Sequence, residues 1–453
     1  MKELPVAFKE RMTAMLGEEE FSRYEASFEE SAVRAFRVNT EKISLEDFAS
    51  INPFSKTPIP YVKNGFYMEY DKAGNHPYHH AGMIYIQDPG AMATAECLEV
   101  QPDWWVLDLC AAPGGKSSQL RNKLGRNGVL VSNEIIPSRC KILTGNMERL
   151  GFRKTATTCM DSARIAQLFP ETFDMIMVDA PCSGEGMFRK DDIAISEWSV
   201  ENVLHCAQRQ REILENAVKA LRQGGYIVYA TCTFSLEENE MLIDAFLRDH
   251  TEFELLPACE AVKLYTDDGI SFDGAYCKNL NDARRFYPHK SRGEGQFMAV
   301  LHDTRELSPR AKTIKKPSEK FDPVVMEFLK DTLREYDPNE VSVYNGNPVY
   351  AAPDLPMGKG VAFSYGVTIG EIRKNYIQPH HQFFMAMGSQ FKRQIELAPD
   401  SDALERYLRG EEIAVDCENG WAVITTQGCA VGGVKVVSGR AKNHYPKGLR
   451  KLS

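Results

Sequence analysis

The sequence predicts an α/β protein organised around a doubly wound parallel sheet, with an α+β lobe before the sheet and a β-rich domain after it. Between residues 86 and 302, short apolar runs alternate with segments of helical length, as they do when helices join parallel strands. Two of these runs, 175–178 and 226–230, are continuously apolar and then give way to polar loops, which is typical of buried parallel strands. Ligand sites lie at the carboxyl ends of such strands, so we look for function there.

The elements of this region can be placed in order from their patterns. Strands are expected at residues 106–110, 129–132, 155–159, 175–178 and 226–230. Helices are expected at 90–100, 116–124, 137–150 and 208–221. Pro137 suits the first turn of its helix, and Gly224 and Gly225 are expected to end the last one.

The flanking segments have different patterns. Residues 1–85 form the N-terminal lobe, with a helical pattern over 5–30 and short strands near 35–38 and 65–69, and the sheet domain covers 86–303. Residues 304–390 comprise a polar, basic linker up to about Pro323 and then a mixed region rich in glycine and proline. Residues 391–453, with strands at 420–425 and 431–437, form a small β-rich domain.

Composition limits the class of protein. At 453 residues, with 43% hydrophobic and 26% charged residues, the chain is long enough for about three globular domains. It has no membrane-length apolar run and no signal-peptide core. Its eleven cysteines are scattered singly, which predicts reduced thiols without a disulfide framework, a zinc site or another metal site. We expect a cytoplasmic monomer that does not bind membranes.

The net charge of -9 argues against a protein that coats nucleic acid with its whole surface, but two segments are locally basic. Between residues 304 and 320 the basic residues are Arg305, Arg310, Lys312, Lys315, Lys316 and Lys320. From residue 435 onwards they are Lys435, Arg440, Lys442, Lys447, Arg450 and Lys451. Either segment alone could be no more than a solvated face.

A glycine turn after the first strand predicts a ligand loop. The strand runs through Cys110, Ala111, Ala112, Pro113, Gly114 and Gly115 into a helix that starts at Lys116. The NTPase phosphate loop would need glycine in place of Cys110, and the dinucleotide fingerprint is absent, which leaves a nucleoside-type cofactor. Glu134 follows the second strand, where it can accept from ribose hydroxyls, and Asp161 follows the third, within reach of a base amino group. The alternative is that both are solvated carboxylates or helix caps.

Two cysteines occupy the loops that follow the two apolar runs. Asp179 and Cys182 lie after the first run, and Cys232 lies after the second, within Thr231-Cys232-Thr233. Parallel strands would deliver both thiols to one edge of the sheet, beside a carboxylate, and this combination suggests covalent catalysis. The alternative is that both cysteines are packed, inert thiols.

With these motifs, and with Arg37-Val38-Asn39, 87–92 and 285–289, the chain resembles the RNA cytosine-5 methyltransferases of the RsmF/NSUN family. The resemblance implies a Rossmann-like domain that binds S-adenosyl-L-methionine through residues 110–116, Glu134, Asp161 and Asp179. It also implies that Cys232 is the nucleophile and that Cys182 assists product release, with Asp179 holding the base.

The same resemblance extends to the ends of the chain. Residues 391–453 look like the PUA-like RNA-binding domain of bacterial members, whose substrate is 16S ribosomal RNA or the small subunit. Residues 1–85 look like an RNA-binding lobe. Phe188, Phe286 and Tyr287 could stack on a base, although an aromatic residue near a sheet end is more often part of the core. Two other functions are considered: a methyltransferase for a protein or small molecule, and a non-catalytic RNA-binding assembly factor that has kept the fold.

Overall fold

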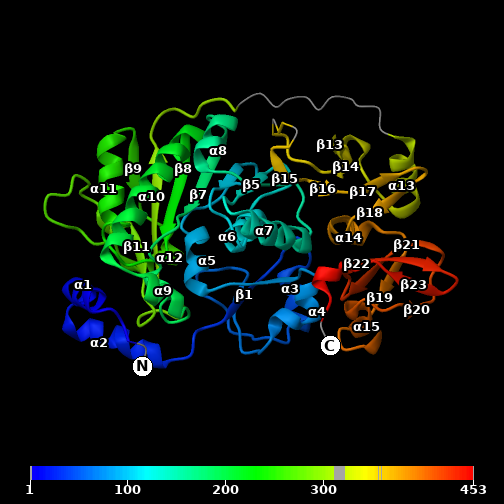
Figure 1. The fold of residues 1–453 in the computed structure, drawn as a ribbon, viewed down its shortest axis with the longest axis horizontal. Coiled ribbons are helices and arrows are strands. Elements are labelled where there is room, and N and C mark those ends of the chain that lie inside the picture. Colours follow the sequence, from blue (N-terminus) through cyan, green and yellow to red (C-terminus); the bar gives the residue numbers. More distant parts are fainter. Residues whose placement is uncertain (1–2, 311–321, 356, 359, 452–453) are drawn as a thin grey trace.

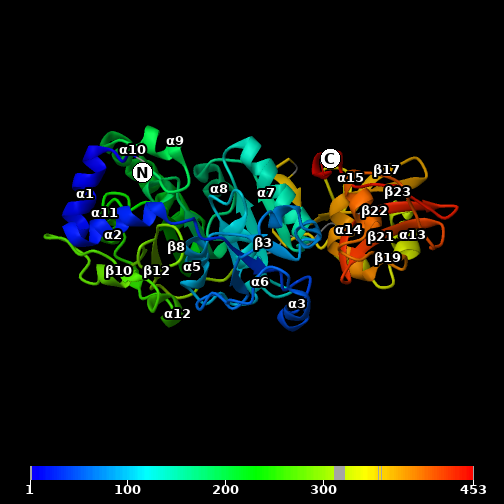
Figure 2. The ribbon, with the colours of Figure 1, turned by 90° about the horizontal axis from the view of Figure 1, so that it is seen from below.

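The structure is a computed structural model that describes residues 3–310, 322–355, 357–358 and 360–451. A large sheet with helices on both faces occupies the middle of the molecule, and the N-terminal segment runs beneath it (Figure 1). The C-terminal segment forms a separate β-rich body at one end, which is clearest in the second view (Figure 2). This arrangement confirms the predicted fold class. No helix in the part of the chain that the structure describes is long and apolar enough to cross a membrane.

The N-terminal lobe combines helices with a three-stranded antiparallel sheet of order β2-β1-β3. The single helical pattern predicted over residues 5–30 is two helices, because Gly17 between them adopts a φ of 82° that ends the first. The elements are α1 (Val6–Leu16), α2 (Glu18–Ala26), β1 (Ala35–Val38), α3 (Leu45–Ile51), β2 (Gly65–Tyr67), α4 (Pro77–His80) and β3 (Ile84–Ile86).

The central sheet has ten strands in the order β10-β11-β12-β8-β7-β4-β5-β6-β15, with β9 paired to β12. Its middle five strands, β6-β5-β4-β7-β8, are parallel, and the strands outside them are antiparallel. The strands are β4 (Trp105–Asp108), β5 (Val129–Asn133), β6 (Thr155–Thr158), β7 (Phe173–Asp179), β8 (Leu221–Thr231), β9 (Phe253–Leu256), β10 (Asp267–Asp268), β11 (Arg284–Phe286), β12 (Gln296–Asp303) and β15 (Ala362–Tyr365).

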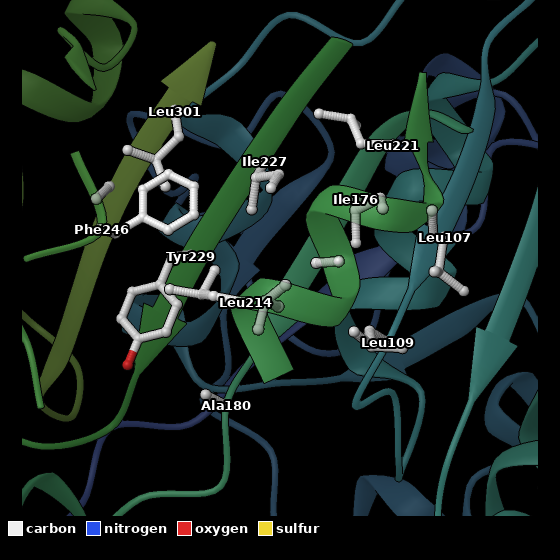
Figure 3. Packing of buried hydrophobic residues seen from close by; sticks show 14 of the residues in the cluster. Leu107, Leu109, Ile176, Ala180, Leu214, Leu221, Ile227, Tyr229, Phe246 and Leu301 are labelled. Atoms are coloured by element: carbon white, nitrogen blue, oxygen red, sulfur yellow. The ribbon is translucent and has the colours of Figure 1, made fainter. Parts of the chain in front are cut away.

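Helices cover both faces of this sheet because alternate strand residues point to opposite sides. One core joins Leu107 of β4 to Leu214 of α10 (Figure 3), and the other joins Val106 to Leu120 of α6. Burial of these side chains is the main stabilising contribution to this domain. The helices are α5 (Pro89–Glu96), α6 (Gly115–Lys123), α7 (Pro137–Leu150), α8 (Ser162–Leu168), α9 (Asp192–Glu197), α10 (Val200–Ala220), α11 (Glu240–Asp249) and α12 (Glu260–Lys263).

The prediction for the segment before the fifth parallel strand was wrong in two respects. Helix α10 begins at Val200 and not near residue 208, and it ends at Ala220, where β8 starts at once. Gly224 and Gly225 therefore lie inside a strand. The register of β7 against β8 shifts between Phe173 and Met175, and Gly224 has a φ of 76°, so the glycines form a bulge in the strand and do not end the helix.

The described residues after β12 include a further strand of the central sheet. Strand β15 pairs with β6 and so extends the central sheet. Arg305 pairs with Asp303 and Arg310 pairs with Asp174, so these two basic residues attach the start of the segment to the sheet domain. Lys312, Lys315, Lys316 and Lys320 lie outside the described residues. The other elements up to residue 390 are α13 (Pro323–Thr332), β13 (Val341–Tyr344), β14 (Asn347–Tyr350), β16 (Val367–Thr368), β17 (Gly370–Arg373), β18 (Tyr376–Pro379) and α14 (His381–Met387).

The C-terminal domain is built on a five-stranded sheet of order β19-β21-β22-β23-β20. It shares one hydrophobic core with the N-terminal lobe, in which Phe36 and Phe48 join Tyr407 and Ile424. The two ends of the chain are therefore packed together. The elements are β19 (Gln394–Glu396), α15 (Asp402–Arg409), β20 (Ile413–Ala414), β21 (Gly420–Thr426), β22 (Cys429–Val437) and β23 (Arg440–Asn443).

We predict that Leu214→Ala lowers the free energy of unfolding by about 2 to 5 kcal/mol, the usual cost of truncating a buried leucine. Leu214 is 1% exposed and packs α10 against the sheet. Leu204→Ala, on the same helix but 52% exposed, should change the value by less than about 0.5 kcal/mol. Urea denaturation followed by circular dichroism measures both. Equal effects of the two variants would contradict the packing described here.

Candidate active site

The carboxyl ends of the five parallel strands meet at one edge of the sheet. The chain passes from β4 outwards to β5 and β6 and then returns to the other side of β4 to form β7 and β8, so β4 is the point where the winding direction reverses. Ligands bind at this point in open α/β sheets. A cavity of about 670 Å³ lies there, and the predicted residues among those that line it are Cys110, Ala112, Glu134, Asp161, Asp179, Cys182 and Cys232.

The three carboxylates predicted to hold a cofactor, Glu134, Asp161 and Asp179, all line this cavity. Glu134 follows β5 directly, its side chain is 4% exposed, and one oxygen accepts from the backbone N–H of Ile136 at 3.0 Å. Asp161 caps α8 by accepting from the backbone N–H of Arg164 at 2.7 Å. The capping role considered for Asp161 is thus present, and it leaves the residue on the cavity wall.

Only part of the glycine turn lines the cavity. Gly114 has a φ of 111° and precedes the first turn of α6, and a Cβ on Gly115 would lie 3.2 Å from the side chain of Gln87. Cys110 and Ala112 line the cavity, whereas Ala111, Pro113, Gly114, Gly115 and Lys116 are not among its lining residues. The turn therefore places two residues of the motif, Cys110 and Ala112, on the cavity wall.

Lys116 points towards the cysteine loop. Its Nζ lies 2.8 Å from Oδ2 of Asp179, and its side chain is 9% exposed. Burial disfavours the charged form of Lys116, but the adjacent Asp179 outweighs this effect and raises the pKa of the lysine. The ion pair fixes one oxygen of Asp179 and leaves that side chain 31% exposed, at the cavity.

The two predicted thiols are in contact. Sγ of Cys182 lies 3.2 Å from Sγ of Cys232, although the residues are 50 positions apart in the chain. The hydrogen bond to Cys232, together with burial, raises the pKa of Cys182 well above its ordinary value. While the two sulfurs are in contact, this hydrogen bond therefore favours the protonated form of Cys182.

Part of the cavity wall was not foreseen from the sequence. Arg209, Glu212, Ile213 and Asn216 of α10 line it at helical spacing. The spacing is visible in the sequence, but which helix lies over the strand ends is not. The stacking role considered for Phe188, Phe286 and Tyr287 was wrong, because these rings are at most 3% exposed. They are core residues; Tyr287, for example, stacks on Phe234 at 5.3 Å between ring centroids.

Comparison with known proteins identifies the family. Residues 4–89 match the N-terminal domain of 16S rRNA methyltransferase RsmF, residues 95–302 match 16S rRNA methyltransferase RsmB/F, and residues 394–451 match the RsmF PUA domain. Ribosomal RNA small subunit methyltransferase F of Vibrio vulnificus (strain YJ016) is 32% identical over 442 residues, covering 92% of this chain and 91% of that protein. The chain belongs to the RsmF family.

Other relatives and solved structures agree with this membership. The methyltransferase F protein of Klebsiella pneumoniae (strain 342) is 32% identical and covers 98% of this chain and 96% of its own length. A methyltransferase homolog protein from Pyrococcus horikoshii has a TM-score of 0.58 and 30% identity, over 66% of this chain and 94% of that one. NSun6 from Pyrococcus horikoshii, solved with SFG, has a TM-score of 0.57 at 22% identity, over 67% of this chain and 99% of that one, and shares the fold.

The PUA domain of this RsmF-family chain carries the second basic segment. Lys435 of β22 and Lys442 of β23 are exposed and lie directly opposite each other across the two strands. Arg440 pairs with Glu412 at 3.4 Å, and Arg450 packs back against the domain. Lys435, Arg440, Lys442 and Lys447 are thus the exposed basic residues of this segment, whereas Arg450 packs against the domain.

Asp108 ends β4 beneath the glycine turn and is fully buried. One of its oxygens accepts a hydrogen bond from Oγ of Ser117 at 2.6 Å, which ties the strand to the first turn of α6. Burial raises the pKa of Asp108 from 3.8 to about 7. The folded protein therefore binds a proton at this site more tightly than the unfolded chain does.

This shift predicts a pH dependence of stability. A raised carboxyl pKa gives stability that is fully present below 3.8 and is lost as the pH rises to about 7. Asp108→Asn cannot ionise, so its free energy of unfolding should fall less than that of the wild type between two pH values inside this window. Urea denaturation at both values measures the difference, with Asp103→Asn, an exposed site, as the control. An identical pH slope in wild type and Asp108→Asn would contradict the shift.

Proposed function

We propose that this protein transfers a methyl group from S-adenosyl-L-methionine to carbon 5 of a cytosine in 16S ribosomal RNA, through a covalent bond between Cys232 and carbon 6. The observation that carries the proposal is the contact of the Cys182 and Cys232 sulfurs at 3.2 Å, on the same cavity as Asp179 and Glu134. A single packed thiol would need no such arrangement. Membership of the RsmF family supports ribosomal RNA as the substrate.

The residues of the cavity suit this methyl donor. Glu134 offers a nearly buried carboxylate oxygen to ribose hydroxyls, and Asp161 can accept from a base amino group. Ile135 and Ile136 add apolar surface beside them. When bound, the donor supplies an electrophilic methyl group on a sulfonium centre. The two cysteines line the same cavity, so donor and base can share one space.

The chemistry explains why thiols are needed. Carbon 5 of cytosine is too weak a nucleophile to accept a methyl group directly. When the thiolate of Cys232 adds to carbon 6, an S–C6 bond forms and the ring becomes an enamine whose carbon 5 is nucleophilic. After methylation, a base must take the proton from carbon 5, and the electron pair of that C–H bond restores the ring double bond as the S–C6 bond breaks. Once the sulfur of Cys232 is bonded to carbon 6, it no longer favours the protonated form of Cys182, so Cys182 can release its own proton to solvent. As a thiolate beside Cys232, directly or through water, it then takes the proton from carbon 5.

Asp179 selects and holds the base. Lys116 fixes one of its oxygens at 2.8 Å, and the carboxylate can accept from the exocyclic amine of cytosine. Uracil has a carbonyl oxygen at this position and would leave the carboxylate without a donor, so cytosine is favoured. Orientation by a held carboxylate also keeps carbon 6 close to the thiolate.

The RNA backbone is bound outside the cavity that takes the base. The relatives named above are ribosomal RNA small subunit methyltransferases, and the family model at residues 394–451 is a PUA domain. Lys435 and Lys442 can contact phosphates, which positions the RNA and leaves base selection to the cavity. Such a substrate places the activity in the cytoplasm.

For the cofactor, we predict that Glu134→Ala weakens S-adenosyl-L-methionine binding by about 1.5 to 3 kcal/mol, because hydrogen bonds to a charged group are lost. Glu201→Ala removes an exposed carboxylate from the first turn of α10 and should leave the affinity unchanged. Isothermal titration calorimetry measures both variants. An unchanged affinity for Glu134→Ala would remove this residue from the cofactor site.

For the two thiols, we predict qualitatively different variants. Cys232→Ala should give neither methylated RNA nor an RNA-linked species on a denaturing gel. Cys182→Ala should still add to the base and methylate it but eliminate slowly, so a slow-migrating RNA–protein species should accumulate.

Two results would contradict this assignment. An adduct that forms in Cys232→Ala and is lost in Cys182→Ala would exchange the roles of the two residues. Full methylation by both variants would exclude covalent catalysis by either cysteine. Cys206→Ala, which removes a buried cysteine of α10, is the matched control and should behave as the wild type in both assays.

A further inference from the structure

The two cysteine loops are joined by two buried carboxylates. Glu185 lies three residues after Cys182 and Glu238 lies six residues after Cys232, and both are at most 2% exposed. Each carboxylate accepts a backbone N–H from the loop that carries the other cysteine. The pair therefore forms a reciprocal clasp, and neither residue belongs to the cavity lining.

Glu185 reaches from the first loop to the second. One of its oxygens accepts from the backbone N–H of Phe234 at 2.9 Å, two residues after the nucleophilic cysteine. The other accepts from Nε1 of Trp198 at 2.9 Å, which holds the carboxylate in place. The neighbouring Gly186 donates its backbone N–H to the carbonyl of Cys232 itself at 2.8 Å. This side of the clasp thus fixes the backbone on which Cys232 sits.

Glu238 reaches in the opposite direction. One oxygen accepts from the backbone N–H of Ser183 at 3.0 Å, directly after Cys182, and from Nε2 of Gln210 at 2.7 Å. The other oxygen accepts from the hydroxyls of Ser183 and, at 2.9 Å, Ser235. Gln210 also donates to the carbonyl of Pro181 at 3.0 Å. The residues on both sides of Cys182 are therefore held by one network.

Such an arrangement is costly for folding alone. Two carboxyl groups have been taken out of water, and burial raises the pKa of both Glu185 and Glu238. Apolar side chains of similar size would often stabilise a core equally well. What apolar side chains could not do is accept the backbone N–H groups that follow the two cysteines and so set the distance between the sulfurs.

We propose that Glu185 and Glu238 are positioning residues that hold Cys182 against Cys232, so that Cys182 can take the proton from carbon 5 while Cys232 is bonded to carbon 6. The inference rests on the proposed function for the order of the chemical steps. Proton transfer requires hydrogen-bond reach, and a displacement of about 1 Å can lower a rate about a hundredfold. A loosened clasp should therefore slow elimination more than it slows cofactor binding.

The test uses two substitutions with opposite expected results. Glu238→Asp keeps the charge but is one methylene shorter, so it cannot reach the Ser183 loop. Glu238→Gln can still accept the fixed N–H groups of Ser183 and Gln210 with its oxygen, and its amide can donate to the two serine hydroxyls, which can rotate to accept. Glu237→Asp, at the adjacent residue that pairs with Arg11, is the matched control.

Three assays are run on the full chain. The first gives kcat and KM for methylation, the second gives the fraction of RNA-linked protein, and the third gives the rate at which diamide, an azo oxidant, forms a Cys182–Cys232 disulfide. In the last reaction two thiols lose two electrons and two protons, which reduce the azo group to a hydrazine. Peptide mass spectrometry identifies the disulfide. This rate reports the distance between the sulfurs without RNA or cofactor.

We expect Glu238→Asp to lower kcat about tenfold or more, to increase the RNA-linked fraction and to slow disulfide formation, with KM for S-adenosyl-L-methionine within about twofold of wild type. Glu238→Gln and Glu237→Asp should resemble the wild type in all three. Glu185→Gln, which must set an amide group against one of two fixed N–H donors, should resemble Glu238→Asp. If Glu238→Asp no longer binds the cofactor, Glu185→Gln is the variant that tests the proposal.

Two results would overturn the proposal. Wild-type kcat and disulfide rate in both Glu238→Asp and Glu185→Gln would show that the loops do not depend on the clasp. Loss of kcat in Glu238→Gln with a normal disulfide rate would make Glu238 a proton carrier and not a positioning residue. Failure of the proposed function is distinguishable, because Cys182→Ala would then trap no RNA while the disulfide rates would still report the clasp.

Discussion

The parallel pairing of β7 with β8 is the constraint on which the site depends. The register sets Val178 opposite Tyr229 and Asp179 opposite Ala230, so both strands reach the edge of the sheet together. Only then can loops 50 residues apart bring two sulfurs within 3.2 Å. The glycine bulge at Gly224 lies at the other end of β8 and absorbs the change of register there. The ends of β7 and β8 that lead to Cys182 and Cys232 therefore stay aligned with each other.

The chemistry of the site could be predicted from the sequence because strand ends are local features. Cys182, Cys232 and Glu134 each lie within four residues after an apolar run, and in a parallel sheet that position alone brings them to one edge. The start of α10 was missed although its signal is present, since Ser199 caps the helix and Val200, Val203 and Leu204 follow at helical spacing. The two glycines of β8 were misread because glycine permits both a helix end and a strand bulge.

Contacts that depend on packing could also not be predicted from the sequence. Nothing in the spacing of Lys116 and Asp179 shows that they pair, and nothing in the positions of Glu185 and Glu238 shows that each accepts an N–H from the other loop. The same holds for the core shared by the N-terminal lobe and the C-terminal domain, which form one packed unit although they lie at opposite ends of the chain. Through this core the PUA domain is held in a fixed relation to the cavity.

The central claim is that the protein methylates carbon 5 of cytosine in small-subunit RNA, and one measurement tests it most directly. Small ribosomal subunits from cells that lack this protein are incubated with it and methyl-labelled S-adenosyl-L-methionine, and the RNA is then digested to nucleosides and separated by chromatography. The account predicts label in 5-methylcytidine, and none when Cys232→Ala replaces the wild type. Label in any other nucleoside, or in protein and not RNA, would contradict it.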